Sequence, residues 1–340
     1  MVRATSMQLM RRSKIIIMTL LILHLTACQS TVNNSRVIAS VFNASTTIQQ
    51  KMIERHAPTQ IQIQHNLVYQ QQPELHLDVY HAVHSERASR PTVVWIHGGG
   101  WISGSKTHAS GYFKRLAAQG FNVISLQYQF APQAIYPTQL QQVDQALRYI
   151  TTHAKDLNID AAQLYLAGDS AGANLASHYA ALVSNPKFAH QSQLTPFLKR
   201  EQLKGLILHC GIYDLASFVA TATDEMHLLT WGIYNLVQAY TGEKKDDVEF
   251  LASISPRQHI TEDYPPVLIS GGNKDFLTDS QSVPFALTLK QHGIAVTEAF
   301  YPDTKEFLVH EYQFMMTKKA SQQTFERTLT FIRQQSALAD

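Results

Sequence analysis

The chain has 340 residues, of which 45% are hydrophobic and 16% charged. This length exceeds the usual size of one domain but suits a single α/β domain with an insertion. The 28 basic and 26 acidic side chains nearly balance, which argues against nucleic acid as a partner. Two cysteines exclude a disulfide-rich class. The sequence has no internal repeat and no spacing typical of metal ligands.

The amino terminus has the pattern of a secretory signal. Four basic residues precede an apolar run at 15–25, which is shorter than the about 20 residues that a spanning helix needs. Residues 25–28, Leu-Thr-Ala-Cys, resemble the bacterial lipobox, which implies that Cys28 is lipidated and begins the mature chain. The alternative is an incidental cysteine. Because Gln29 is not Asp, the resemblance to lipoproteins of diderm bacteria predicts a lipid-anchored protein of the cell envelope, at the outer membrane. The polar residues 29–34 are expected to form a tether.

Alternating strands and helices follow. Residues 61–65 and 75–80 alternate apolar and polar side chains, which predicts two early strands. Residues 122–126 form a short apolar run, and residues 138–153 have apolar side chains at helical spacing. This alternation favours a mostly parallel sheet.

A glycine run follows the apolar strand at 93–96. Residues 97–101 read His-Gly-Gly-Gly-Trp, which matches an oxyanion loop of the HGGG type. Glycines leave backbone N–H groups uncovered, so that they can bind an oxygen that becomes negative during acyl transfer. We predict Gly99 and Gly100 as donors and a structural role for His97. The alternative is a flexible glycine turn.

The sequence Gly-Asp-Ser-Ala-Gly at 168–172 has the form of a nucleophile elbow. An apolar run at 164–167 precedes it, and a segment suited to a helix follows. In this motif the serine lies on a strained turn from strand to helix, with its hydroxyl exposed. Ser170 is therefore the candidate nucleophile. The N–H of Ala171, at the start of the helix, is the third predicted oxyanion donor.

The order of the remaining partners supports this interpretation, because hydrolases with this elbow place the acid and then the histidine after the serine. Asp275 follows the apolar strand at 266–270 and is the candidate acid. Asp279 is its competitor. His310 lies in a loop after the strand-like run 295–301 and is the candidate general base. His292 lies at a helix end closed by glycine, where histidines more often serve the helix terminus.

The alternation of strands and helices stops after the buried strand at 206–210. The segment 215–263 is helical in character and rich in aromatic residues, among them Trp231, Tyr234 and Tyr240. We interpret it as a cap insertion, with plain core packing as the alternative role for its aromatics. Trp101, beside the oxyanion loop, is the better candidate for a wall of the substrate pocket. Cys210 has no disulfide partner if Cys28 is lipidated.

Together these motifs resemble the hormone-sensitive-lipase-like branch of the α/β-hydrolases over about residues 60 to 335. The resemblance also includes Tyr136-Pro137, Asp144, Tyr213-Asp214 and Ser255-Pro256. It implies an eight-stranded, mostly parallel sheet flanked by helices, a helical cap, and hydrolysis of short-chain carboxylic esters without metal or cofactor. Two positions depart from the family pattern. An Arg and an acidic residue that many members carry are absent from 128–133, and Ala173 replaces a common glycine.

The chain is thus expected to comprise a signal peptide (1–27), a tether and N-terminal helical or cap segment (28–59), a hydrolase core (60–214 and 264–340) and a cap (215–263). The sequence predicts a serine carboxylesterase for small, possibly acetyl, esters, with Ser170, Asp275 and His310 as its triad. The alternatives are an amide or formamide hydrolase of the same fold, or a non-catalytic envelope module. We expect a membrane contact through the lipid at Cys28 and leave the oligomeric state open.

Overall fold

A single eight-stranded sheet forms the centre of the molecule. The computed structural model describes residues 30–83, 90–222 and 227–336. The strand order is β1-β2-β4-β3-β5-β6-β7-β8. The first two strands pair antiparallel to each other and β2 to β4, and all other pairs are parallel. The strands are β1 (Ile63–Gln71), β2 (Glu74–Tyr80), β3 (Thr92–Ile96), β4 (Asn122–Leu126), β5 (Leu164–Asp169), β6 (Leu203–His209), β7 (Val267–Gly271) and β8 (Val296–Phe300).

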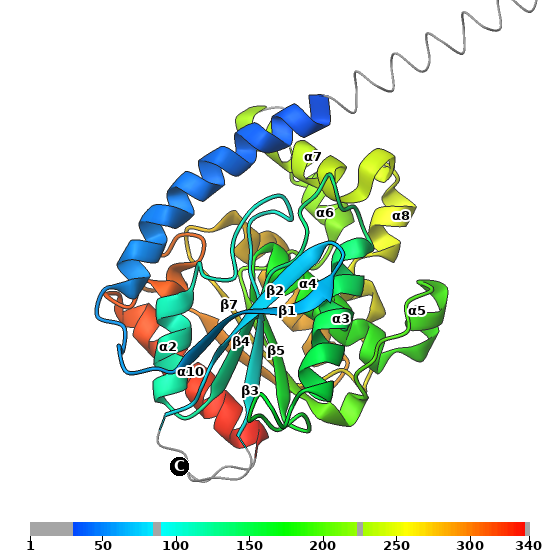
Figure 1. Ribbon diagram of the computed structural model, residues 1–340. Coiled ribbons are helices and arrows are strands. Elements are labelled where there is room, and N and C mark those ends of the chain that lie inside the picture. The colour runs from blue at the N-terminus through cyan, green and yellow to red at the C-terminus, as the bar shows by residue number, and fades with distance from the viewer. Residues whose placement is uncertain (1–29, 84–89, 223–226, 337–340) are drawn as a thin grey trace, which may run out of the picture.

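Helices cover both faces of the sheet (Figure 1). Every residue of β3, β4, β5 and β7 is buried, as expected for parallel strands packed on both sides. One face carries α3 (Thr138–Thr152), α4 (Ala171–Ser184) and α9 (Val283–Gln291), and α5 (Pro186–Gln191) packs beside α4. The other face carries α2 (Ser110–Ala118) and α10 (Lys319–Gln335). The predicted fold, a mostly parallel eight-stranded sheet flanked by helices, is confirmed.

The described part of the segment predicted to form a cap is largely helical, as its sequence suggested. It contains α6 (Leu215–Ala220), α7 (His227–Thr241), α8 (Val248–Ser253) and the short turns η3 (Gly242–Lys244) and η4 (Pro256–His259). These elements lie between β6 and β7 in sequence. They occupy one end of the sheet, next to α4 (Figure 1).

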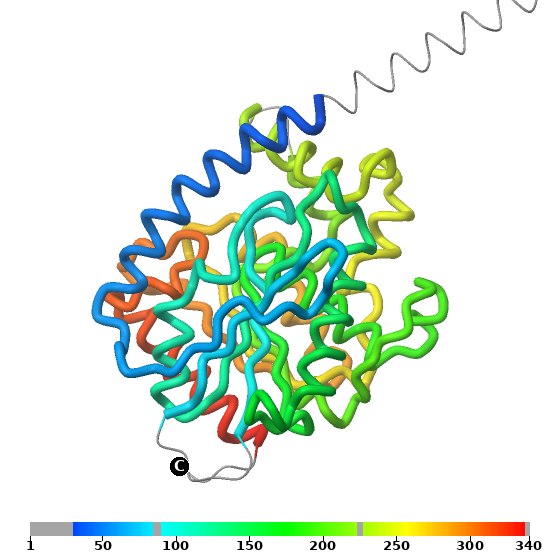
Figure 2. The backbone as a smooth tube through the Cα atoms, viewed as in Figure 1, coloured from blue at the N-terminus to red at the C-terminus, as the bar shows by residue number. Residues whose placement is uncertain are grey.

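A helix at residues 30–54, the N-terminal helix, lies across the molecule from the α7 region to α2 (Figure 2). It contacts α7 through a hydrogen bond of 2.9 Å from Asn34 to Asn235 and α2 through an ion pair of 2.8 Å between Glu54 and Lys114. Within the described residues, the tether expected at 29–34 is therefore wrong from residue 30 onward, because Thr31 and Ser35 are buried within a helix. The signal peptide, Cys28 and Gln29 lie outside the described residues.

No helix among the described residues is both long enough and apolar enough to cross a membrane.

Candidate active site

The three predicted triad residues lie after neighbouring strands of the sheet. Ser170 directly follows β5, Asp275 follows β7, and His310 follows β8. Because β5, β6, β7 and β8 are successive parallel neighbours, their carboxyl ends meet at one edge, where open α/β sheets bind their ligands. The fold thus brings the three residues to the same edge.

Ser170 has the backbone conformation of a nucleophile elbow. Its φ is 51° and its ψ is −120°, a strained region that few residues other than glycine adopt. Its N–H donates to the carbonyl of His209 at 2.9 Å, so the turn is fixed to the end of β6. A Cβ at Gly172 would collide with the carbonyl oxygen of Ile96, and therefore the motif requires glycine there. This close approach packs α4 against the end of β3.

Asp275 and His310 form a direct contact. The Nδ1 of His310 lies 2.8 Å from Oδ2 of Asp275, and the Asp275 side chain is buried while that of His310 is 39% exposed. The N–H of Leu277 donates to the other carboxylate oxygen. Asp275 thus orients the imidazole and leaves its Nε2 available for chemistry. The competing Asp279 is exposed in η5 (Thr278–Ser282), and His292 caps the end of α9, where its Nδ1 lies 2.9 Å from the carbonyl of Thr288.

Cys210 is a neighbour of His310 that sequence reasoning missed. It directly follows β6, and its buried thiol hydrogen-bonds to His310. Burial raises the pKa of Cys210 to about 11, so the thiol is neutral near pH 7. Burial works against a charge on His310, whereas Cys210 and Asp275 favour it and raise its pKa. Since Cys210 is protonated at neutral pH, Asp275 is the group that supports the imidazolium there.

The glycine loop leaves free donors beside Ser170. The N–H of Gly98 donates to Asp169 at 2.8 Å, while Gly99 and Gly100 have φ values of 109° and 59° that disfavour side chains. Within the described part of the chain, no protein group accepts a hydrogen bond from the N–H of Gly99 or Gly100. The N–H of Ala171 is also available, because the first residue of a helix has no intrahelical acceptor. The arrangement fits the predicted oxyanion donors.

His97 is enclosed by the protein. It is buried, it stacks on Tyr128 with a centroid distance of 4.4 Å, and its Nδ1 contacts the carbonyl of Gly98. Burial lowers its pKa to about 4, so the ring is neutral at physiological pH. This environment fits the structural role expected for His97.

Asp169 is the second residue that sequence reasoning missed. Its buried carboxylate accepts hydrogen bonds from the indole Nε1 of Trp95 at 2.7 Å and from the N–H of Gly98. It also shares a hydrogen bond with Glu311, the residue after His310. One side chain therefore connects the elbow, the glycine loop and the histidine loop. In the sequence, this role is indicated only by the position of an acidic residue at the end of an apolar strand.

The pocket wall expected at Trp101 is wrong in this geometry. Trp101 is completely buried and stacks on Tyr240 of α7, with ring centroids 4.4 Å apart. A side chain without exposed surface cannot line a substrate pocket, and the stacking on Tyr240 joins the glycine loop to the cap. The residues next to Gly100 are instead Phe42 of the N-terminal helix and Leu236 of α7, 3.2 and 2.6 Å from the position that a Cβ at Gly100 would occupy.

Neutral groups occupy the segment where the family pattern has charges. The side-chain amides of Gln129 and Gln142 hydrogen-bond to each other at 2.7 Å, and the hydroxyl of Tyr128 donates to the carbonyl of His97. These contacts support the base of the glycine loop without an ion pair.

Two groups of side chains among the described residues lie close enough to share a metal ion, and both are hydrogen-bonded clusters. One contains Cys210, Asp275 and His310, and the other contains His108, Asp169 and Glu311. The carboxylates of Asp275 and Asp169 already accept protein hydrogen bonds, and Glu311 shares one with Asp169. The structure therefore accounts for both clusters by their internal hydrogen bonds.

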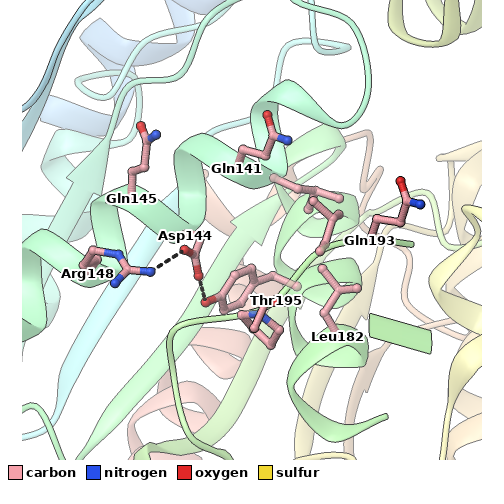
Figure 3. A pocket seen from close by; sticks show the side chains of 11 residues that line it. Gln141, Asp144, Gln145, Arg148, Leu182, Gln193 and Thr195 are labelled. Carbon is pink, nitrogen blue, oxygen red and sulfur yellow. Dashed lines mark hydrogen bonds and ion pairs between the residues drawn. The ribbon is translucent and has the colours of Figure 1, made fainter. Parts of the chain in front are cut away.

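A separate hollow of about 390 Å³ lies beside α3 and α4 (Figure 3). It contains Asp144, whose carboxylate accepts hydrogen bonds of 2.6 Å from the hydroxyl of Tyr179 and the N–H of Phe197. Arg148 lies 3.6 Å from the second oxygen. These contacts give Asp144 a structural role. None of the triad residues lines this hollow.

The sheet order, the elbow after β5 and the acid and histidine after β7 and β8 define an α/β-hydrolase. The BD-FAE family model matches residues 77–289, more than half of the chain, and the chain belongs to this family. The expected membership in the esterase branch of the α/β-hydrolases is thereby confirmed at the level of family and fold.

Relatives and solved structures agree with this assignment. An acetyl esterase of Salmonella paratyphi B is 27% identical over 235 residues, which cover 67% of this chain and 68% of the relative. One from Salmonella typhi is 26% identical over the same coverage. Among solved structures, an inhibited esterase B from Lactobacillus rhamnosis has a TM-score of 0.74 at 20% identity, covering 89% of this chain and 97% of that one. An esterase of Pyrobaculum calidifontis has a TM-score of 0.69 at 22% identity, covering 90% and 94%.

The geometry predicts that Ser170→Ala lowers ester turnover by roughly a thousandfold or more, because a triad acts as one unit. The expected fold is unchanged, since the substitution removes one hydroxyl oxygen. Turnover of p-nitrophenyl acetate by purified protein, with circular dichroism as the folding control, measures this. Parental turnover in a folded Ser170→Ala protein would exclude the mechanism.

The contact at 2.8 Å predicts that Asp275→Asn lowers kcat by about ten-thousandfold, since an amide favours the wrong imidazole tautomer. Asp279→Asn is the matched control and should stay close to the parent, because Asp279 is exposed. Comparable losses in the two variants would contradict the assignment of the acid.

Proposed function

We propose that this protein is a serine carboxylesterase that hydrolyses short-chain carboxylic esters through an acyl-enzyme. The main support is the contact of 2.8 Å between Asp275 and His310. This contact lies at the same edge of the sheet as Ser170, which has the strained conformation of a nucleophile elbow. This arrangement supplies a nucleophile, a base and an orienting acid, the three groups that acyl transfer requires.

The reaction follows from these positions. Ser170 attacks the ester carbonyl while His310 takes its proton, and Asp275 stabilises the resulting imidazolium. The N–H groups of Gly99, Gly100 and Ala171 hold the oxyanion. His310 then protonates the leaving alcohol. Water activated by the same histidine resolves the acyl-enzyme and restores Ser170.

Small acyl groups suit the surroundings of the glycine loop. Phe42 and Leu236 pack against Gly100 and limit the space beside the reacting carbonyl. The similarity to acetyl esterases of Salmonella supports the same substrate size. Retention of the elbow, the acid and the histidine argues against a non-catalytic module.

We expect kcat/KM on p-nitrophenyl esters to rise or hold from acetyl to about hexanoyl and to fall tenfold or more at dodecanoyl. Each buried methylene gains about 0.8 kcal/mol, but overpacking a filled channel costs about 1 to 3 kcal/mol. Leu236→Ala should move the optimum to longer chains, and Leu287→Ala, exposed on α9, should not. A steady increase through long chains in the parent would contradict the short-ester assignment, and faster cleavage of a matched anilide would favour an amidase.

We also propose that the protein is anchored in the bacterial cell envelope, at the outer membrane, by lipid on Cys28. The support is the lipobox-like sequence at 25–28, which follows a basic and apolar signal.

To test the anchor, Cys28→Ser should be secreted behind a cleavable signal that replaces residues 1–27. This variant should keep its esterase activity and be removed from membranes by a high-salt wash, whereas the lipidated parent should remain because acyl chains are insensitive to salt. Release of the parent by the same high-salt wash would show that the lipobox interpretation is wrong.

A further inference from the structure

The N-terminal helix presents an apolar stripe to solvent. Val37, Val41, Ile48 and Met52 are each between 51% and 63% exposed. Their spacing of four, seven and four residues places them on one side of the helix. Isolated exposed apolar residues are ordinary, but an aligned set on one helix marks a surface that contacts another apolar medium.

The stripe is not the face by which this helix packs on the enzyme. Ser35, Ile38 and Ile53 are buried, and Phe42 contacts the glycine-loop region. The helix is therefore held to the fold by one set of side chains and carries a second apolar set outward. A surface helix of a globular protein needs apolar side chains only on the face that packs against the core.

The exposed charge next to the stripe is positive. Arg36 and Lys51 are exposed basic residues of the helix, and Arg55 directly follows it. Glu54 is the single acidic residue at positions 30–54, and it is engaged by Lys114 and by the hydroxyl of Ser110. An apolar stripe bordered by Lys and Arg is the composition that favours an anionic lipid surface.

The neighbouring part of the cap adds apolar surface at one end of this helix. Leu228 of α7 is 81% exposed, and Trp231, one turn further along, is also exposed. Asn34 and Asn235 join the two helices. Tryptophan at an exposed position favours the boundary between lipid and water.

We propose that the N-terminal helix lies in the headgroup region of an anionic phospholipid bilayer, with Val37, Val41, Ile48 and Met52 facing the lipid. Two observations favour lipid over a protein partner. The residues next to the stripe are basic, and the helix at 30–54 follows closely after Cys28 in the sequence. The proposal rests in that respect on the proposed envelope location. The helix that covers the glycine loop would then also orient the enzyme on the membrane.

The test uses the Cys28→Ser chain secreted behind a cleavable signal, so that no lipid anchor contributes. Its binding to vesicles of phosphatidylcholine with phosphatidylglycerol should exceed its binding to pure phosphatidylcholine and should weaken with salt. Val41→Glu/Ile48→Glu should lower binding tenfold or more. Val248→Glu/Leu287→Glu, equally exposed apolar positions on α8 and α9, is the matched control and should bind like the background protein.

Absence of vesicle binding by the background protein, or equal binding by both double variants, would overturn the proposal. So would a dimer in lipid-free solution that Val41→Glu/Ile48→Glu dissociates, because the stripe would then face a second copy. Hydrolysis of soluble p-nitrophenyl acetate by every variant keeps this outcome separate from the esterase assignment. Mass spectrometry of Cys28 in the parent tests lipidation independently.

A second inference concerns Glu311. This residue follows His310 in sequence and contacts Asp169, the residue before Ser170. Glu311 is buried and adopts a left-handed φ of 59°, so its side chain contacts Asp169 while His310 contacts Asp275. Gln49 of the N-terminal helix also hydrogen-bonds to Glu311, and to His108 at 2.8 Å.

The surroundings keep Glu311 protonated. Burial, followed by the charge of Asp169, raises the pKa of Glu311 to about 8, although His310 and the hydrogen bond from Gln49 act in the opposite direction. His108 is neutral because burial lowers its pKa. His209, which lies near Asp169, is also neutral for the same reason, with its pKa lowered to about 4. His97, described above, is likewise neutral.

We infer that Glu311 is a positioning residue that donates a hydrogen bond to Asp169 and thereby ties the histidine loop to the nucleophile elbow. Loss of its proton places two carboxylates side by side in the protein interior. The resulting repulsion would separate the two loops that must align Ser170 with His310.

The test measures kcat and KM against pH for the parent, Glu311→Gln and Glu311→Ala. The parent should lose kcat, with little change in KM, as the pH rises through about 8. Glu311→Gln retains a donor without a titrating proton and should lack this alkaline loss, whereas Glu311→Ala should lower kcat tenfold or more at every pH. An alkaline loss that persists in Glu311→Gln, or an Ala variant with parental kcat, would overturn the inference. If Glu311→Ala does not fold, the pH profile of Glu311→Gln still decides.

Discussion

The carboxylate of Asp169 is the contact on which the site geometry depends. It accepts hydrogen bonds from Trp95 and from the N–H of Gly98, at 2.7 and 2.8 Å, within a fully packed interior. A buried carboxylate without partners would cost several kcal/mol, so the chain segments that supply its donors are held where they are. These segments are the end of β3 and the glycine loop, and Asp169 itself ends β5 and precedes Ser170. Removal of this carboxylate would leave buried donors unpaired and release the loop from the elbow.

A second constraint on the glycine loop is its packing against the cap and the N-terminal helix. Trp101 stacks on Tyr240, and Phe42 and Leu236 pack against Gly100. The loop is thus held by the hydrogen bond from Gly98 to Asp169 and by apolar contacts with the cap and the N-terminal helix. Because the N–H groups of Gly99 and Gly100 are not used in this packing, they remain available to a substrate oxygen. Preorganised donors of this kind act without a reorganisation cost when charge develops.

The local elements and the order of the triad could be predicted from the sequence because they depend on short-range patterns. The strand at 122–126 and the helix starting at 138 follow from hydrophobic periodicity. The position of Asp275 follows from its place just after an apolar strand. Contacts between distant segments could not be predicted. The burial of Trp101 depends on a partner in α7, and the Asp169–Glu311 contact depends on how two loops meet. The polar composition of residues 30–34 favoured a tether, but these residues begin a helix whose Asn34 hydrogen-bonds to Asn235 of α7.

Intact-protein mass spectrometry after fluorophosphonate treatment shows whether Ser170 is the residue that forms the covalent intermediate. Fluorophosphonates react with activated serines, and Cys210, with its pKa raised by burial, should not compete. We expect one adduct per chain, located by peptide mapping on Ser170, and no adduct in folded Ser170→Ala. An unlabelled but folded parent, or labelling that persists in Ser170→Ala, would contradict the assignment of Ser170 as the nucleophile.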